Sequence, residues 1–451
     1  MTGAPAEGTG VGTGVGAALE LWGGVECTVS RVQDAYIDQV EQTGHATRDG
    51  DLDRIADLGI KTLRYPVLWE RVAPRSLSNA DWSWTDRRLG RLRELGVEPI
   101  FGLMHHGSGP THTWLGDPSF PDKLARYAGV CAQRYPWIKW VTPVNEPLTT
   151  ARFSGLYGHW YPHHQSDRRF VRMLLNQCLA VRAAMRSIRA VAPDARLMQT
   201  EDLGHIHAGA RLRYQAQFEN ERRWLTWDLL CGRVVAGHPL RPYLLANGAS
   251  YRELHDLAAH PCPPDLIGID YYVTSERYLD DQVDRYDGRA VGGNGIHQYA
   301  DVDVARVDPG LRRGLASLMC ETWERYQIPI TVSEAHLSCD DEVERVRWLM
   351  ESWNAAITAR YAGCDVRSVT AWALFGACGW DSLATTPNGR YEAGAFDVSG
   401  AIHGVPRATR LTAAIASLAR KGYYTDSALS APGWWEATHR DSQLRRVTVT
   451  A

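Results

Sequence analysis

Short apolar runs alternate with longer segments of helical periodicity along most of the chain. The runs are expected to form strands buried on both faces, because apolar residues follow one another in them without polar alternation. Eight such runs lie near residues 18–24, 61–68, 98–104, 138–144, 196–200, 265–272, 328–333 and 368–375. No Pro/Gly/Ser-rich linker and no repeat interrupts them, so the pattern indicates one α/β domain.

Two segments between the runs show apolar residues at helical spacings of three and four. The first consists of Phe120, Leu124, Tyr127, Ala128 and Cys131. The second consists of Leu179, Ala183, Met185 and Ile188, in a stretch low in Gly and Pro. Eight strands alternating with helices favour a single closed (β/α)8 TIM barrel over an open doubly wound sheet.

The two ends of the chain depart from this alternation. Residues 1–18 are predicted to be a flexible Gly-rich N-terminal tail, since no strand precedes the glycines and no Lys follows them as in a phosphate loop. Residues 19–425 are assigned to the barrel, which accommodates this length as one unit, and residues 426–451 to a C-terminal tail.

Charge and cysteine content narrow the classes of partner and compartment. A net charge of −3 gives no electrostatic reason to expect nucleic acid or an anionic membrane. The apolar runs are too short to cross a bilayer, and the first residues lack the basic start and apolar stretch of a secretory signal. Nine cysteines without paired spacing are interpreted as reduced thiols, so we expect a cytoplasmic protein.

Two glutamates that lie 188 residues apart each follow an apolar run. Glu146 follows the fourth run, and Glu334 follows the seventh. In a barrel, the C-terminal strand ends carry the reacting groups. Glycoside hydrolysis uses two carboxyls, about 5 Å apart in retaining enzymes and roughly 6.5–9.5 Å apart in inverting ones. Taken alone, a glutamate at a strand end more often places a charge in solvent.

The motif Trp140-Val-Thr-Pro-Val-Asn-Glu-Pro147 resembles the Thr-x-Asn-Glu-Pro signature of family 1 glycoside hydrolases, the β-glucosidase family. Further matches follow in the same order and span roughly residues 19 to 420. They are Leu21-Trp-Gly, Leu63-Arg-Tyr-Pro-Val-Leu-Trp69, Leu103-Met-His-His106, Asp265-Leu-Ile-Gly-Ile-Asp-Tyr-Tyr272 and Ala371-Trp-Ala-Leu374. The segments 24–32 and 391–397 are similar to a divergent bacterial branch, in which such a module is often fused to a dTDP-4-dehydrorhamnose reductase.

This resemblance implies a retaining mechanism without a cofactor. Glu146 would be the general acid and then the base, and Glu334 the nucleophile that forms a glycosyl-enzyme intermediate. Asn145 would bind the sugar 2-hydroxyl, and His105 other hydroxyls of the sugar.

The resemblance also implies three groups around the reacting pair. Arg64 would keep Glu334 ionised and oriented, Tyr272 would donate to Glu334, and Trp372 would stack beneath the sugar ring. Without the resemblance, a salt-bridged structural Arg, a packed Tyr and a core His are the more common interpretations of such residues.

The chain departs from the family at positions that grip the sugar. A glutamate that precedes a tryptophan in the family is absent from Ala377-Cys-Gly-Trp380-Asp381, unless Asp381 replaces it beside Trp380. The family's glutamine near the end of strand one is also absent, with Glu26, Ser30 or Arg31 in its neighbourhood.

Further departures lie closer to the reacting pair. His106 stands where a Trp is usual, Asp270 replaces an Asn, and His336 follows the predicted nucleophile. The altered positions suggest a deoxy, amino or otherwise modified sugar. Glu201 and Asp202, after the fifth run, are interpreted as exposed loop acids, with ligand binding as the alternative.

The expected partner is a small-molecule glycoside, and no metal is predicted. His105, His106 and His112 share one loop, but no Cys and no second ligand set accompanies them. Two alternatives remain open beside hydrolysis: a glycoside-binding barrel without turnover, and a non-hydrolytic enzyme of glycosyl transfer or rearrangement in secondary metabolism. The sequence predicts no oligomeric state.

Overall fold

Eight parallel strands close into a barrel, in the spatial order β1-β14-β13-β9-β7-β6-β5-β4. The protein is described here from a computed structural model covering residues 18–436 except 289–290, 388 and 401–403. The barrel strands are β1 Glu20–Gly24, β4 Thr62–Pro66, β5 Glu98–Gly102, β6 Trp140–Thr142, β7 Arg196–Asp202, β9 Leu266–Tyr271, β13 Ile330–Ala335 and β14 Val366–Ala371. Each predicted run overlaps one of these strands, which confirms the TIM barrel.

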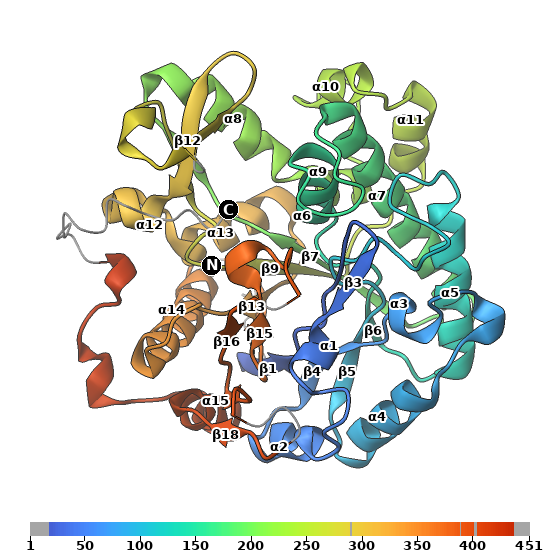
Figure 1. The fold of residues 1–451 in the computed structure, drawn as a ribbon, viewed down its shortest axis with the longest axis vertical. Helices are drawn as coiled ribbons and strands as arrows, with labels where there is room; N and C mark the ends of the chain where they lie inside the picture. Colours follow the sequence, from blue (N-terminus) through green and yellow to red (C-terminus); the bar gives the residue numbers. More distant parts are fainter. Residues whose placement is uncertain (1–17, 289–290, 388, 401–403, 437–451) are drawn as a thin grey trace, which may run out of the picture.

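The barrel closes where the first strand pairs with both the second and the last. In β1, Gly23 lies opposite Leu63 of β4 on one side and opposite Ala371 of β14 on the other. All barrel pairings are parallel, so the eight C-terminal strand ends meet at one rim. In Figure 1 the strands occupy the centre of the view, and most of the helices surround them.

Fifteen α-helices lie within the described residues. They are α1 Gln39–Gln42, α2 Asp51–Asp57, α3 Trp69–Val72, α4 Ser83–Glu94, α5 Phe120–Arg134, α6 Pro147–Ala151, α7 Asp167–Arg189, α8 Arg213–Arg222, α9 Leu225–Leu230, α10 Arg241–Ala246, α11 Tyr251–Ala259, α12 Val304–Val307, α13 Gly314–Tyr326, α14 Glu342–Tyr361 and α15 Arg410–Lys421. The predicted face of α5 is fully buried. In α7, Met185 and Ile188 are buried, whereas Leu179 and Ala183 are only half-buried, because the buried face runs instead through residues such as Leu174 and Cys178.

Among the described residues, three two-stranded antiparallel sheets lie in the loops that follow the barrel strands. They are β2 Val29–Val32 with β3 Ala35–Asp38, β15 Ala377–Cys378 with β16 Tyr391–Glu392, and β17 Phe396–Asp397 with β18 Arg407–Ala408. A four-stranded sheet combines β8 Ile206–Ala208, β10 Arg277–Asp280, β11 Val291–Gly293 and β12 Gln298–Asp303. Figure 1 shows β12 beside α8 at the upper left, away from the barrel axis.

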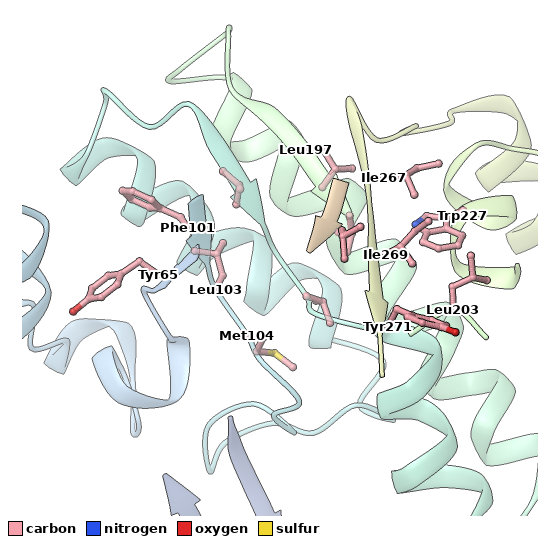
Figure 2. Packing of buried hydrophobic residues seen from close by; sticks show 14 of the residues in the cluster. Tyr65, Phe101, Leu103, Met104, Leu197, Leu203, Trp227, Ile267, Ile269 and Tyr271 are labelled. Atoms are coloured by element: carbon pink, nitrogen blue, oxygen red, sulfur yellow. The ribbon is translucent and has the colours of Figure 1, made fainter. Parts of the chain in front are cut away.

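Strand alternation divides apolar side chains between the outside and the inside of the barrel. Ile267, Ile269 and Tyr271 of β9 join the large core cluster outside the barrel, where Figure 2 shows Trp227 beside them. Inside, Trp22, Ile100, Met198 and Leu266 form a separate apolar layer. The opposite end of the lumen is left for polar side chains.

The last described residues pack on the barrel helices. Trp435 is buried in the main core, and its ring lies edge-on to Trp348 of α14 with centroids 5.0 Å apart. The predicted boundary of the C-terminal tail at residue 426 stays a prediction, and residues 1–17 lie outside the described residues. Within the described part of the chain, every helix is too short or too polar to span a bilayer.

Candidate active site

Glu334 lies at the C-terminal end of β13, inside the barrel rim, and is only 2% exposed. Its Oε1 accepts a hydrogen bond from Arg64 Nη1 at 2.7 Å, and its Oε2 accepts one from the Tyr272 hydroxyl. The structure thus brings together three residues, any two of which are more than 60 positions apart in the sequence. Both contacts favour the ionised carboxylate.

Glu146 lies four residues beyond the end of β6 rather than on the strand itself. It is the N-cap of α6, in a left-handed conformation with φ 43° and ψ 66°, which is uncommon for a residue other than glycine. An isolated parallel bridge between His105 and Asn145 continues the pairing of the β5 and β6 segments up to this turn. The turn directs Glu146 into the rim, where the residue is 3% exposed.

The two glutamates share the rim with Asp270 at the end of β9. One carboxylate oxygen from each of Glu146, Asp270 and Glu334 lies within 4.8 Å of the others. This limit on the nearest oxygens places Glu146 and Glu334 within range of the carboxyl separation of about 5 Å found in retaining glycosidases. Such a trio has the donor type of a cation site, but Arg64 already neutralises Glu334, so the arrangement fits a shared proton equally well.

The surroundings of the two glutamates differ in charge. Burial raises the pKa of Glu146 well above its ordinary value, and the charges of Asp270 and Glu334 raise it further. Burial and Asp270 also raise the pKa of Glu334 well above its ordinary value, although Arg64 and the Tyr272 hydroxyl act in the opposite direction. Only Glu334 has a cation in contact, so a proton held by the pair is favoured on Glu146.

Arg64 joins several of the predicted site residues. Its Nη1 donates to the Ser333 carbonyl at 2.8 Å as well as to Glu334, and its Nη2 donates to Asn145 Oδ1 at 2.6 Å. The guanidinium also lies over the Trp372 ring, 4.8 Å from its centroid. Arg64 therefore fixes the nucleophile candidate and the amide together.

Asn145 has partners at both ends of its amide. Its Oδ1 also accepts from the Thr200 hydroxyl at 2.8 Å, and its Nδ2 lies 3.2 Å from His106 Nε2. His106 in turn contacts the Thr150 hydroxyl through Nδ1 at 3.1 Å. The contact with His106 uses one of the two N–H donors of Asn145 Nδ2, and the second remains for a sugar hydroxyl.

His105 offers an unused nitrogen to the site. Its Nε2 has no hydrogen-bond partner within the described residues and lies 3.9 Å from both Glu26 Oε1 and Glu334 Oε1. Burial, together with the neighbouring His106 and Arg64, lowers the pKa of His105 well below its ordinary value, so the ring is neutral.

The three residues named for the missing glutamine separate in space. Glu26 is buried near His105 and accepts from its own loop at the Thr28 N–H, 2.8 Å away. Ser30 instead donates to the Ala384 carbonyl, and Arg31 stacks over the Tyr161 ring at 3.7 Å. Of the three, only Glu26 lies beside the reacting pair.

Trp372 follows β14 and is 5% exposed. The ring of His105 lies nearly parallel to its indole, with centroids 5.3 Å apart and an interplanar angle of 17°. Gly24 makes room for this indole, because a Cβ there would lie 2.3 Å from Trp372 Cε3. His105 therefore stacks on the indole that is predicted to carry the sugar.

Trp380 and Asp381 lie in the loop after β15. Trp380 is half-buried with its edge toward His106, at a centroid distance of 5.6 Å, and its Nε1 has no partner within the described residues. Asp381 is exposed. His336 does not face the carboxyls, because its ring bonds the Trp372 carbonyl at 3.0 Å and Glu392 at 3.1 Å.

Side chains from distant parts of the sequence bind the loop from 378 to 387, and no sequence pattern marks them. Gln39 pairs with both the N–H and the carbonyl of Cys378, and Trp160 Nε1 donates to the Leu383 carbonyl at 2.7 Å. Trp160 also lies against His106, with ring centroids 5.4 Å apart. These contacts hold the loop and Trp160 next to His106, which lies 3.7 Å from Glu146 Oε2.

The interpretation of Glu201 and Asp202 as exposed loop acids is wrong. Glu201 is fully buried, and burial raises its pKa to about 8. It accepts from the Leu148 N–H at 2.7 Å and from the Thr226 hydroxyl, so it holds the first turn of α6 and points away from the lumen. Asp202 accepts from the Ser275 hydroxyl.

The histidines of the loop after β5 do not converge on one point. His112 packs edge-on to Trp69, at a centroid distance of 5.7 Å, and His106 is held by Asn145 and Thr150. Within the described residues, the only set of three potential metal donors is the carboxyl trio.

Three comparisons with known proteins bear on the family and the fold. The profile of the family described as Glycosyl hydrolase family 1 matches residues 16–386. The chain is 22% identical over 352 residues to the phospho-cellobiase of Klebsiella oxytoca, covering 71% of this chain and 74% of that protein. It is 21% identical over 430 residues to beta-glucosidase 47 of Arabidopsis thaliana, covering 84% and 76% respectively.

Among solved structures, a beta-glucosidase from Thermotoga maritima in complex with deoxynojirimycin has the same fold. It superposes with a TM-score of 0.70 at 16% identity, covering 88% of this chain and 97% of that chain. The narrower resemblance to the reductase-fused branch stays a prediction.

Proposed function

The chain belongs to glycosyl hydrolase family 1 and is an O-glycosyl hydrolase, and from this premise we propose that it is a retaining β-glycosidase acting through Glu146 and Glu334. The observation that carries the proposal is the carboxyl trio, whose oxygens lie within 4.8 Å of one another. The unequal charge environment of the two glutamates supports their separate roles.

In the first step, the Glu334 carboxylate attacks the anomeric carbon while Glu146 gives its proton to the glycosidic oxygen. The bond to the leaving alcohol breaks, and a glycosyl ester of Glu334 forms. In the second step, the Glu146 carboxylate takes a proton from water as the water oxygen attacks the anomeric carbon. The ester bond breaks, and Glu334 is restored as a carboxylate with retention of configuration.

The charges at the rim bear on whether the sugar carries a phosphate. Four carboxyls are buried at the rim, those of Glu26, Glu146, Asp270 and Glu334, whereas the ion pairs of Arg64 reach only Asp270 and Glu334. A relative is named a phospho-cellobiase, but a phosphate on the sugar would add negative charge to a site that already has an excess of it. A neutral or amino-substituted sugar fits the balance better than a phosphorylated one.

The proposal is tested with a panel of chromogenic β-glycosides that includes hexosides, 6-deoxyhexosides, 2-amino sugars and 6-phosphoglycosides. We expect release of the chromophore from at least one unphosphorylated member and none from the 6-phosphoglycosides. Proton NMR of the first sugar released should show the β-anomer. First release of the α-anomer would contradict the retaining mechanism.

Two groups predicted to hold the sugar already have a partner in the protein. His106 Nε2 lies 3.2 Å from Asn145 Nδ2, which keeps a second N–H donor, and the ring of His105 stacks on that of Trp372. Silence across the panel, combined with saturable binding of a glycoside by calorimetry, would contradict the proposal and indicate a glycoside-binding barrel without turnover. Products formed only when an alcohol or sugar acceptor is added would instead indicate glycosyl transfer.

A further inference from the structure

Asp270 occupies the place next to both reacting carboxyls without taking part in the proposed bond changes. It is paired in register with Glu334 across β9 and β13, and it is 0% exposed. Its Oδ1 accepts from the Ser333 hydroxyl at 2.5 Å, whereas its Oδ2 has no hydrogen-bond partner within the described residues. A buried carboxylate oxygen without a donor is costly, so a partner is expected for it.

The space around Asp270 is made by a glycine. Gly268 lies two residues earlier on the same strand face, and a Cβ there would lie 2.5 Å from Ser333 Oγ and 2.6 Å from Thr200 Cγ2. The absent side chain lets β7, β9 and β13 approach beneath the carboxyl. Asp270 then lies opposite Glu334 in the pairing of β9 with β13.

One oxygen of the Asp270 carboxyl lies within 4.8 Å of one oxygen of the Glu146 carboxyl. Two ionised carboxylates this close repel one another, whereas a proton on one of them can be donated to the other, and Asp270 Oδ2 has no other partner within the described residues. Arg64 Nη1 lies 3.8 Å from Asp270 Oδ1 but only 2.7 Å from Glu334 Oε1, so the cation is committed to Glu334.

The other charged or titratable groups near the trio do not supply a second cation. His105 and His106 are neutral because burial and Arg64 lower the pKa of each, that of His106 to about 3. Glu26, Asp202 and Tyr272 also face the trio, and none of them is a cation. The guanidinium groups of Arg152 and Arg277 act on Asp202 rather than on the trio. The trio must therefore lower its own repulsion by keeping a proton.

We propose that Asp270 is a positioning residue for the catalytic proton: its carboxyl shares one proton with Glu146 and so keeps the general acid protonated in the free enzyme. The proposal rests on the assignment of Glu146 as the acid. An asparagine in place of Asp270 has no charge and would offer Glu146 an N–H donor, which favours the ionised form. Aspartate and asparagine thus act on Glu146 in opposite directions.

The test is the titration of Glu146 itself in Asp270→Asn. Protein labelled with carbon-13 at the glutamate side-chain carboxyl gives one resonance for each glutamate, and the resonance missing from Glu146→Gln identifies Glu146. We expect Glu146 to titrate at lower pH in Asp270→Asn than in the parent protein. This titration needs no substrate, so its outcome does not depend on whether the hydrolase proposal is correct.

Glu70→Gln is the matched control, because Glu70 is a buried carboxyl outside the trio whose pKa burial raises to about 7. It should remove its own resonance and leave the titration of Glu146 unchanged. Where turnover is measurable, both limbs of the kcat/KM profile should move to lower pH in Asp270→Asn, since Glu146 and Glu334 both lose a neighbouring charge. A Glu146 titration that is the same in Asp270→Asn and the parent, or that moves equally in Glu70→Gln, would overturn the proposal.

Discussion

Arg64 Nη1 lies 2.7 Å from Glu334 Oε1, and both side chains are buried. Removing one partner of a buried ion pair leaves the other charge without compensation, which typically costs about 3–5 kcal/mol. We expect Arg64→Gln to lower the free energy of unfolding by an amount in this range, measured by urea denaturation at pH 7.

The same change should move the acidic limb of the activity profile. Without the guanidinium, the pKa of Glu334 rises, so the nucleophile becomes ionised only at higher pH. Arg64→Lys is the matched control. It keeps a positive charge near Glu334, but an ammonium lacks the planar fork with which the guanidinium donates to Glu334 and Asn145 together. An acidic limb that stays in place in Arg64→Gln would argue against a role of Arg64 in keeping Glu334 ionised.

Glu334→Gln should lower turnover by several orders of magnitude while the fold persists, because the amide keeps the volume but cannot form the ester intermediate. Circular dichroism checks the fold, and mass spectrometry of the parent protein with a slow 2-fluoro glycoside checks the ester. We expect the adduct on the peptide containing Glu334. Activity like that of the parent protein in Glu334→Gln would reject the assignment.

Glu146→Gln should discriminate between leaving groups. Loss of a general acid typically costs about 10²–10⁴-fold, but substrates with acidic phenol leaving groups need little protonation and should lose less in the first step than alkyl glycosides. The comparison is made on kcat/KM for the two substrate classes. An equal loss for both would contradict the acid role.

The barrel was predictable because its signal is local. Strands buried on both faces appear as uninterrupted apolar runs, and each of the eight runs falls on a barrel strand. The fourth is much shorter than its apolar run, since β6 ends at Thr142 and the chain then turns to place Asn145 and Glu146 at the rim. Apolar content alone cannot show where such a turn begins.

The contacts that enclose the site could not be predicted in this way. Gln39 meets Cys378 across 339 positions, and Trp160 meets Leu383 across 223, and no local pattern marks either pair. The orientation of Glu201 follows from the alternation of side chains along β7. Thr200 faces the lumen and bonds Asn145, so alternation along β7 turns Glu201 toward α6.

Glu201 also leads to a prediction about stability and pH. Burial raises its pKa in the folded state to about 8, above the ordinary value of 4.5. A group whose pKa is higher in the folded state binds its proton more tightly there, so stability is greatest below the unfolded pKa and falls as pH rises through the folded pKa. The loss from this group should therefore extend from about pH 4.5 to about pH 8.

Glu201→Gln removes the titration but keeps an oxygen that can accept from the Leu148 N–H and the Thr226 hydroxyl. We expect its free energy of unfolding to fall less between pH 5 and pH 8 than that of the parent protein, measured by urea denaturation at several pH values. Glu219→Gln is the control, because Glu219 is a buried glutamate that is ion-paired with Arg222. If Glu201→Gln and the parent protein lose stability in parallel across this range, Glu201 is not the source of the loss.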